Sequence, residues 1–126
     1  MTPPHSVLVV DDYADTLEML SVALEIAGYG VLLATSGDDA LRMARSHHPA
    51  AVVMDIFMPG MDGIEATRQL RAEPDLASIP VVAHTAQPWG LAGIEDLFDA
   101  ICMKPCPPTE LIALLGQALE SKGGDA

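Results

Sequence analysis

Basic residues are scarce in this chain of 126 residues. Six lysines and arginines stand against 18 aspartates and glutamates, which gives a formal net charge of −12. Proteins bind nucleic acid largely by neutralising its phosphates with Lys and Arg. We therefore expect no nucleic acid to be bound by this domain, and we interpret its acidic surface as a means of keeping the protein in solution.

Cysteines, long apolar runs and targeting features are also few. The two cysteines, Cys102 and Cys106, make no disulfide framework, and their spacing is not that of a zinc site. No apolar run approaches the roughly 20 residues that a membrane span needs. The start Met-Thr-Pro-Pro-His lacks the charged and apolar regions of a signal peptide. We expect a cytoplasmic protein with reduced thiols and no membrane contact.

Half of the residues are apolar, and 126 residues are enough to bury one sizeable core. We expect a single domain over 1–126, with its core at about 6–119 and a tail or the start of a linker at 120–126. Apolar runs alternate with helical patterns, which is typical of βαβ units around a parallel sheet. The runs predict five strands, near residues 6–10, 30–34, 51–54, 80–84 and 100–103. The predicted fold class is α/β, a flavodoxin-like doubly wound five-stranded parallel sheet in the order 2-1-3-4-5.

The helices between these strands are marked by apolar spacing and by capping residues. Gly28 is placed to end the first helix, and Pro107-Pro108 to open the last. Ser36 and Asp39 form a possible capping box for the second helix, and a third helix should run over 63–71. The residues expected to face the core are Leu17, Leu20, Leu24, Ala27, Ala40, Leu41, Ala44, Leu111, Leu115 and Ala118.

Five polar residues stand just after apolar runs that read as strands. They are Asp11, Asp12, Asp55, Thr85 and Lys104. Ligands of open parallel sheets bind beyond the carboxyl ends of the strands. Since the first and third strands are neighbours in the predicted order, the three carboxylates should meet at one edge of the sheet.

Such a cluster has a definite chemistry. Three neighbouring carboxylates repel one another and stay ionised only if a cation shares the site. Oxygen ligands favour Mg²⁺, and a carboxylate beside the metal can attack phosphorus to form an aspartyl-phosphate. Lys104 would balance the charge of the phosphoryl oxygens, and Thr85 could donate a hydrogen bond to one of them.

These residues lie in motifs that resemble those of response-regulator receiver domains, the phosphoacceptor modules of two-component signalling, with a chemotaxis-regulator-like fold. The motifs come in the family's order: Val-Asp-Asp at 10–12, Met-Asp-Ile-Phe-Met-Pro-Gly-Met-Asp-Gly at 54–63, His-Thr-Ala at 84–86 and Lys-Pro at 104–105. The resemblance runs from about Ser6 to about Leu119.

The resemblance implies a role for each metal-site residue. Asp55 would be the phosphorylation site. Asp12 and Asp55 would bind Mg²⁺ directly, together with the backbone carbonyl of Phe57, and Asp11 would act through a metal-bound water. Thr85 would be the switch hydroxyl that moves toward the phosphoryl group. The position of Lys104 matches the family's lysine, and the following bond to Pro105 is often cis in the family.

Three departures from the family pattern concern signal transmission. Ile101 stands where receivers usually carry a switch Tyr or Phe, and Cys106 replaces the usual Phe or similar residue after Lys-Pro. The stretch between Thr85 and Lys104 is shorter than usual and holds proline and glycine, so the fourth helix should be short, displaced or mobile. His84 stands where receivers usually carry an apolar residue, and we interpret it as a packed strand residue.

Two functions remain open. The first is a phosphoacceptor switch that takes its phosphoryl group from a histidine kinase or a histidine phosphotransfer protein. It would not be an enzyme beyond self-phosphorylation from a phosphodonor and self-dephosphorylation. The second is a receiver-like module that binds proteins without phosphorylation. The residues name neither the kinase nor the downstream partner, and they leave the oligomeric state open. An FMN-binding flavodoxin is disfavoured because no Ser/Thr/Gly-rich phosphate loop follows Val10.

Overall fold

A single parallel sheet organises the chain. The computed structural model describes residues 5–123, and its five strands follow the order β2-β1-β3-β4-β5. The strands are β1 (Ser6–Val10), β2 (Gly30–Ala34), β3 (Ala51–Asp55), β4 (Val81–Thr85) and β5 (Ala100–Met103). The helices are α1 (Ala14–Ile26), α2 (Gly37–His47), α3 (Gly63–Ala72) and α4 (Pro108–Gly123), and two short 3₁₀ turns are η1 (Pro88–Leu91) and η2 (Glu95–Leu97). The predicted fold class and strand order are confirmed.

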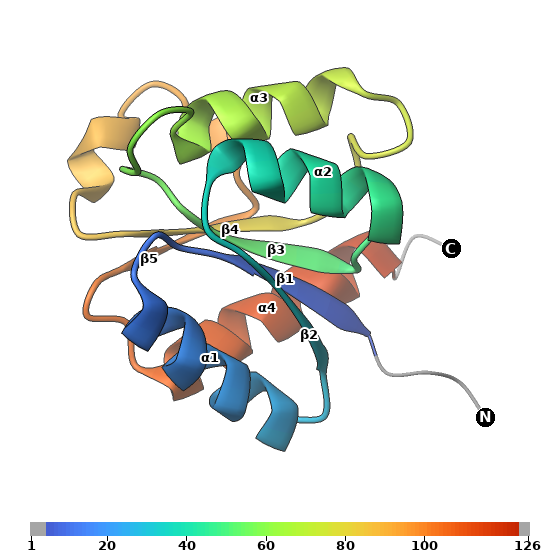
Figure 1. The fold of residues 1–126 in the computed structure, drawn as a ribbon, viewed down its shortest axis with the longest axis vertical. Coiled ribbons are helices and arrows are strands. Elements are labelled where there is room, and N and C mark those ends of the chain that lie inside the picture. The colour runs from blue at the N-terminus through green and yellow to red at the C-terminus, as the bar shows by residue number, and fades with distance from the viewer. Residues whose placement is uncertain (1–4, 124–126) are drawn as a thin grey trace.

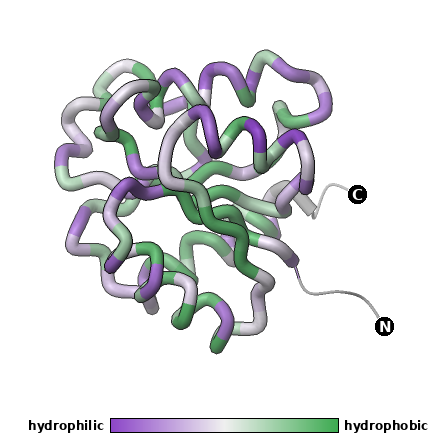
Figure 2. Tube along the Cα trace, in the orientation of Figure 1, coloured by the Kyte–Doolittle hydropathy of each residue, from purple (hydrophilic) through white to green (hydrophobic). Residues whose placement is uncertain are grey.

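Helices cover both faces of the sheet, so the molecule has three layers. Helices α1 and α4 lie on one face, and α2 and α3 lie on the other (Figure 1). Alternate residues of β1 point to the two sides: Leu8 and Val10 belong to one buried apolar cluster, and Val7 and Val9 to the other. Strands buried on both faces are apolar throughout rather than alternating, as the green strands in the centre of Figure 2 show. Within residues 5–123, no helix combines the length and the apolar character that crossing a lipid bilayer requires.

Most of the predicted helix faces are confirmed. Leu17, Leu20 and Leu24 are buried, as are the expected core residues of α2 and α4. Ala27 was expected on the same face but is exposed, because the helix ends before it and Gly28 follows with φ +100°. At α2, the Ser36 hydroxyl accepts a hydrogen bond from the Asp39 N–H at 3.1 Å.

The second hydrogen bond of the expected capping box, from the Ser36 N–H to the Asp39 carboxylate, is not among the hydrogen bonds around α2. The Asp39 carboxylate accepts from the N–H of Thr35 at 3.3 Å rather than from that of Ser36. Helix α3 matches its predicted range to within one residue. Helix α4 continues to Gly123, so residues 120–123, expected in a tail or linker, are helical. The remainder of that expected tail, 124–126, lies outside the described residues.

The sequence predicted a short, displaced or mobile fourth helix between β4 and β5. The structure has no α-helix in this connection. The turns η1 and η2 take its place (orange in Figure 1). Pro88 opens η1, and Gly93 adopts φ +87°, a conformation that L-residues with side chains rarely adopt. Leu91 and Phe98 are buried and anchor the segment to the core.

Arg71 of α3 holds this connection in place. Its guanidinium donates to the Leu97 carbonyl oxygen at 2.8 and 3.1 Å and forms an ion pair with Asp99 at 3.1 Å. It also donates to the carbonyl oxygens of Ala77 and Ile79, at 2.9 and 2.7 Å. One side chain thereby satisfies carbonyl groups of two separate loops, a task for which the planar fork of Arg is suited and Lys is not.

We expect Arg71→Ala to lower the free energy of unfolding by about 2–3 kcal/mol, because it leaves partly buried carbonyl groups without their charged donor. Arg71→Lys should recover only part of this loss. Urea denaturation measures both, with Arg68→Ala as the control on an exposed position of the same helix. A loss no larger than that of the control would contradict this role.

Candidate functional site

The five predicted polar residues come together at the carboxyl edge of the sheet. Asp11 and Asp12 follow β1, Asp55 ends β3, Thr85 ends β4 and Lys104 follows β5. Strands β1 and β3 are paired neighbours, which brings their acidic residues side by side. All five residues and Phe57 line one cleft of about 350 Å³. Sequence reasoning therefore located the cluster correctly.

The acidic group consists of Asp11, Asp12 and Asp55. One carboxylate oxygen of each lies within 4.8 Å of those of the others. Asp11 and Asp55 are almost fully buried, whereas Asp12 is exposed. Hard oxygen donors in this arrangement fit Mg²⁺, which takes one or two carboxylates and keeps several waters.

Lys104 is the positive partner of the buried acids. Its Nζ lies 3.2 Å from Asp11 Oδ2 and 3.3 Å from Asp55 Oδ1. Its backbone N–H donates to the Thr85 carbonyl oxygen at 2.8 Å, which ties the loop after β5 to the end of β4. The bond from Lys104 to Pro105 is cis, as the resemblance implied.

The carboxyl group of Asp55 has a higher pKa than an exposed aspartate. Burial, and then the charge of Asp11, raise the pKa of the Asp55 carboxyl to about 6, although the Lys104 ammonium acts in the opposite direction. One ammonium therefore compensates the buried acids only in part. A further cation at this edge would favour the ionised form of Asp55.

Thr85 and Phe57 connect the cleft to the β4–β5 connection. The buried Thr85 hydroxyl accepts a hydrogen bond from the N–H of Gln87 at 3.0 Å, directly before η1. The Phe57 ring lies against Gly90 of η1, where an added Cβ would be 2.7 Å from the ring Cζ. Sequence reasoning assigned Phe57 a role through its carbonyl only and missed this ring contact. No local pattern relates residues 33 positions apart.

Ile101, predicted to stand at an atypical switch position, lies in β5. Ile101 is half-buried, pairs with Ala83 in the register of β4 and β5, and packs against the apolar cluster on the α2–α3 side. Trp89, the only tryptophan, is 68% exposed on η1. The aromatic residues that line the cleft are Tyr13 and Phe57, and β5 contributes no aromatic ring.

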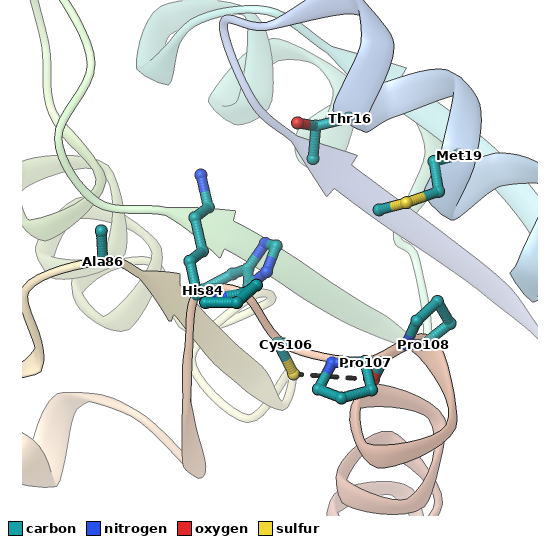
Figure 3. A pocket seen from close by; sticks show the side chains of 9 residues that line it. Thr16, Met19, His84, Ala86, Cys106, Pro107 and Pro108 are labelled. Carbon is teal, nitrogen blue, oxygen red and sulfur yellow. Dashed lines mark hydrogen bonds between the residues drawn. The ribbon is translucent and has the colours of Figure 1, made fainter.

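The expectation of reduced thiols is wrong for this structure. Cys102 of β5 and Cys106 form a disulfide across a separation of four residues, with their Cα atoms 5.9 Å apart. Sequence spacing did not reveal it, because the approach of the two sulfurs depends on the path of the loop between them. A cavity of about 650 Å³ adjoins this bridge (Figure 3).

His84 lines this second cavity. It is buried, as its interpretation as a packed strand residue required. Burial, and then the nearby Lys104 charge, lower the pKa of its imidazole to about 4, against the opposing influence of Asp11. The imidazole is therefore neutral at pH 7.

The raised pKa of Asp55 predicts a pH-dependent stability. Its carboxyl titrates near pH 6 in the folded chain and near 3.9 when unfolded. The unfolded state loses the proton first, so stability falls as the pH rises from about 4 to about 6. Without divalent cations, Asp55→Asn should therefore be more stable than the wild type at pH 7, by about 2–3 kcal/mol, and gain little at pH 4.

Urea unfolding at the two pH values checks this, with Asp75→Asn as the exposed control. Added Mg²⁺ should narrow the gap at pH 7, because a cation favours the ionised carboxylate. If the stability difference between Asp55→Asn and the wild type is the same at pH 4 and at pH 7, the Asp55 pKa is not raised.

The chain resembles several known proteins in sequence. Residues 7–116 match the response regulator receiver domain family. The "Probable transcriptional regulator ycf27" of Porphyridium aerugineum is 35% identical over 115 residues, 91% of this chain and 48% of that protein. The "DNA-binding response regulator MtrA" of Mycobacterium tuberculosis is 36% identical over 112 residues, 89% of this chain and 49% of that protein. The chain thus spans about half the length of the curated relatives it matches.

Solved structures share the fold over nearly the whole chain. A putative response regulator from Chloroflexus aurantiacus has a TM-score of 0.84 and 36% identity, and the match covers 92% of this chain and 98% of that one. The chemotaxis response regulator CheY4 of Vibrio cholerae has a TM-score of 0.85 and 27% identity, with 91% and 98% covered. Since the family match also spans most of the strands, helices and polar residues described above, the chain belongs to the response-regulator receiver family.

Proposed function

We propose that Asp55 is the residue on which this receiver domain accepts a phosphoryl group, and that the donor is a phosphohistidine of a histidine kinase or phosphotransfer protein. The observation that carries the proposal is the contact of Lys104 Nζ with both Asp11 and Asp55, at 3.2 and 3.3 Å. It supports the proposal because the Asp55 carboxylate lies beside a fixed positive charge, in a cleft that is open to a partner.

Three residues of the cleft take part in the proposed transfer. An Asp55 carboxylate oxygen attacks phosphorus, the new O–P bond forms as the P–N bond of the phosphohistidine breaks, and the donor imidazole keeps the electron pair. Lys104 balances the charge of the phosphoryl oxygens, and Thr85 donates its hydroxyl hydrogen to one of them. Attack of water on phosphorus later releases phosphate and restores the carboxylate.

The residues that would hold Mg²⁺ in this proposal are Asp12, Asp55 and the backbone carbonyl of Phe57, with Asp11 acting through a metal-bound water. Bound there, the ion supplies positive charge at the phosphoryl oxygens. The three clustered carboxylates and the raised Asp55 pKa support this assignment, because both describe a site with too little positive charge. We propose a cytoplasmic location for the domain, in keeping with this role.

Receivers are signalling modules rather than a class of enzymes, and we propose that the chemistry of this chain is limited to gain and loss of its own phosphoryl group. MtrA is described as DNA-binding, but this chain spans only about half of it. We propose that residues of the present domain bind no nucleic acid, given its net charge of −12.

A second candidate function is protein binding without phosphorylation. The observation in its favour is the altered transmission region, with Ile101 at the switch position and two 3₁₀ turns in place of a helix. The two functions differ in whether occupation of Asp55 changes the structure elsewhere. In the first function, the η1 segment responds to the phosphoryl group.

Thr85 supplies a route for that response. Its hydroxyl accepts the Gln87 N–H, so turning it toward a phosphoryl group breaks this bond and releases the start of η1. The Phe57 ring against Gly90 links the same turn to the loop after Asp55. A ligand that favours one arrangement of η1 by its contacts shifts the population toward it.

Acetyl phosphate with Mg²⁺ should add one acid-labile phosphate to the wild type and none to Asp55→Asn, because the amide is no nucleophile. Intact-mass measurement detects the adduct, chelation of Mg²⁺ should prevent it, and Asp75→Asn is the control. Equal labelling of the wild type and Asp55→Asn would remove Asp55 from this role.

Beryllofluoride with Mg²⁺, a mimic of the phosphoryl group, should change the fluorescence of Trp89, and Thr85→Ala should abolish the change. Thr35→Ala, an exposed threonine beyond β2, serves as the control and should respond like the wild type. If Trp89 emission and hydrogen exchange over 86–97 both stay unchanged in the wild type, the phosphorylation-independent binding function is favoured.

A further inference from the structure

The Cys102–Cys106 bridge encloses the residue that neutralises the phosphorylation cleft. The two cysteines flank Met103, Lys104 and Pro105. Lys104 reaches back to Asp11 and Asp55 from within this short loop. The entropic gain from a disulfide grows with the length of the loop that it closes, so such a small loop contributes least to global stability. The main effect of the bridge is on the local path of the chain that carries Lys104.

The bridge can be reached from solvent at one end only. Both cysteines are buried, but Cys106 lines the 650 Å³ cavity between α1 and the loop before α4, and Cys102 does not. Figure 3 shows Cys106 facing this space together with Met19, His84 and Pro108. A small molecule in the cavity would therefore meet the Cys106 sulfur first.

The surroundings also suit the reduced form. The Cys106 Sγ lies 3.8 Å from the carbonyl oxygen of Pro107, the contact dashed in Figure 3. In the disulfide the sulfur has no hydrogen to donate, but a Cys106 thiol would find an acceptor there. The apolar cluster around Cys102 accommodates a free thiol as a small apolar group. The surroundings of both cysteines therefore suit the disulfide and the two free thiols alike.

We propose that Cys102 and Cys106 form a thiol–disulfide exchange site that reacts with small glutathione-class thiols and disulfides entering the cavity. In oxidation, the Cys106 thiolate attacks a sulfur of the small disulfide, forms a mixed disulfide and expels one thiolate. The Cys102 thiolate then attacks the Cys106 sulfur and expels the second thiolate. Two electrons pass from the protein thiols to the small disulfide, and the thiol protons go to solvent. Reduction by two small thiols reverses both steps.

The exchange site acts on the phosphorylation cleft through Lys104, and this part rests on the proposed function. With the bridge closed, the loop from Met103 to Pro105 is constrained and the ammonium is held at the two carboxylates. Opening the bridge gives this loop more conformations, and a less well positioned charge stabilises the transferring phosphoryl group less. Reduction should therefore slow labelling of Asp55 by acetyl phosphate, by about fivefold.

The exchange is tested first without phosphorylation. The wild-type chain is equilibrated in glutathione buffers of graded redox poise and its thiols are counted by alkylation and intact mass. Both thiols should appear together as the buffer becomes more reducing. A wild-type bridge that persists in excess reduced glutathione, or thiols that stay reduced in oxidised glutathione, would overturn the proposal. So would stoichiometric zinc protecting the reduced thiols, since Cys102, Cys106 and Glu110 also cluster within 4.8 Å.

Two matched variants test the order of attack. Cys102→Ala keeps the cavity sulfur without its partner and should accumulate a mixed disulfide with glutathione. Cys106→Ala leaves only the Cys102 sulfur, which does not line the cavity, and should acquire glutathione about tenfold more slowly than Cys102→Ala. Equal rates would overturn the role of the cavity, and urea unfolding of both variants verifies that they are folded.

The rate at which acetyl phosphate labels the oxidised and the reduced wild type then tests the coupling. The double variant Cys102→Ala, Cys106→Ala is the control, and its labelling rate should not depend on the redox buffer. Equal rates for the two wild-type forms would overturn the coupling while leaving the exchange site intact. Absence of labelling in every form would instead overturn the proposed function, a result that the thiol measurements do not depend on.

Discussion

The site depends on the contact between the Lys104 ammonium and two buried carboxylates. Asp11 and Asp55 could not both be ionised next to each other in an apolar setting without a countercharge. One ammonium compensates them incompletely, since the pKa of Asp55 remains raised to about 6. The acidic residue left exposed, Asp12, extends the cluster toward solvent. The proposed binding of Mg²⁺ and of a phosphoryl group at Asp55 rests on this imbalance of charge.

Around this charged centre, two 3₁₀ turns stand where a fourth helix was expected, and a few contacts hold them. The segment between β4 and β5 is held by its buried Leu91, by the guanidinium of Arg71 and by the Thr85–Gln87 hydrogen bond. Few such contacts need to change for η1 to rearrange, whereas a helix would have to move as a unit. In the proposed switch, this segment takes the part that an aromatic residue on β5 would otherwise have in responding to the state of Asp55.

Long-range contacts account for most of what sequence reasoning missed. The Arg71 contacts with Leu97, the Phe57 ring against Gly90 and the cavity beside Cys106 join segments that no local pattern relates. The bridge between Cys102 and Cys106 is close in sequence, but it forms only because the loop folds back between β5 and α4. The errors at Ala27 and at 120–123 concern helix ends, where a single turn is worth little free energy and packing decides.

By itself, the sequence determined the five strands, their order and the five polar residues that gather at one edge. Apolar runs and helical spacing depend on neighbours along the chain, and a parallel sheet brings all its carboxyl ends to one side. Tertiary structure alone decided the protonation behaviour of Asp55 and His84, the sulfur bridge and the contacts that hold the β4–β5 connection. These depend on burial, on contacts between residues far apart in the chain and on the path of a loop that folds back on itself. Composition and spacing do not contain these quantities.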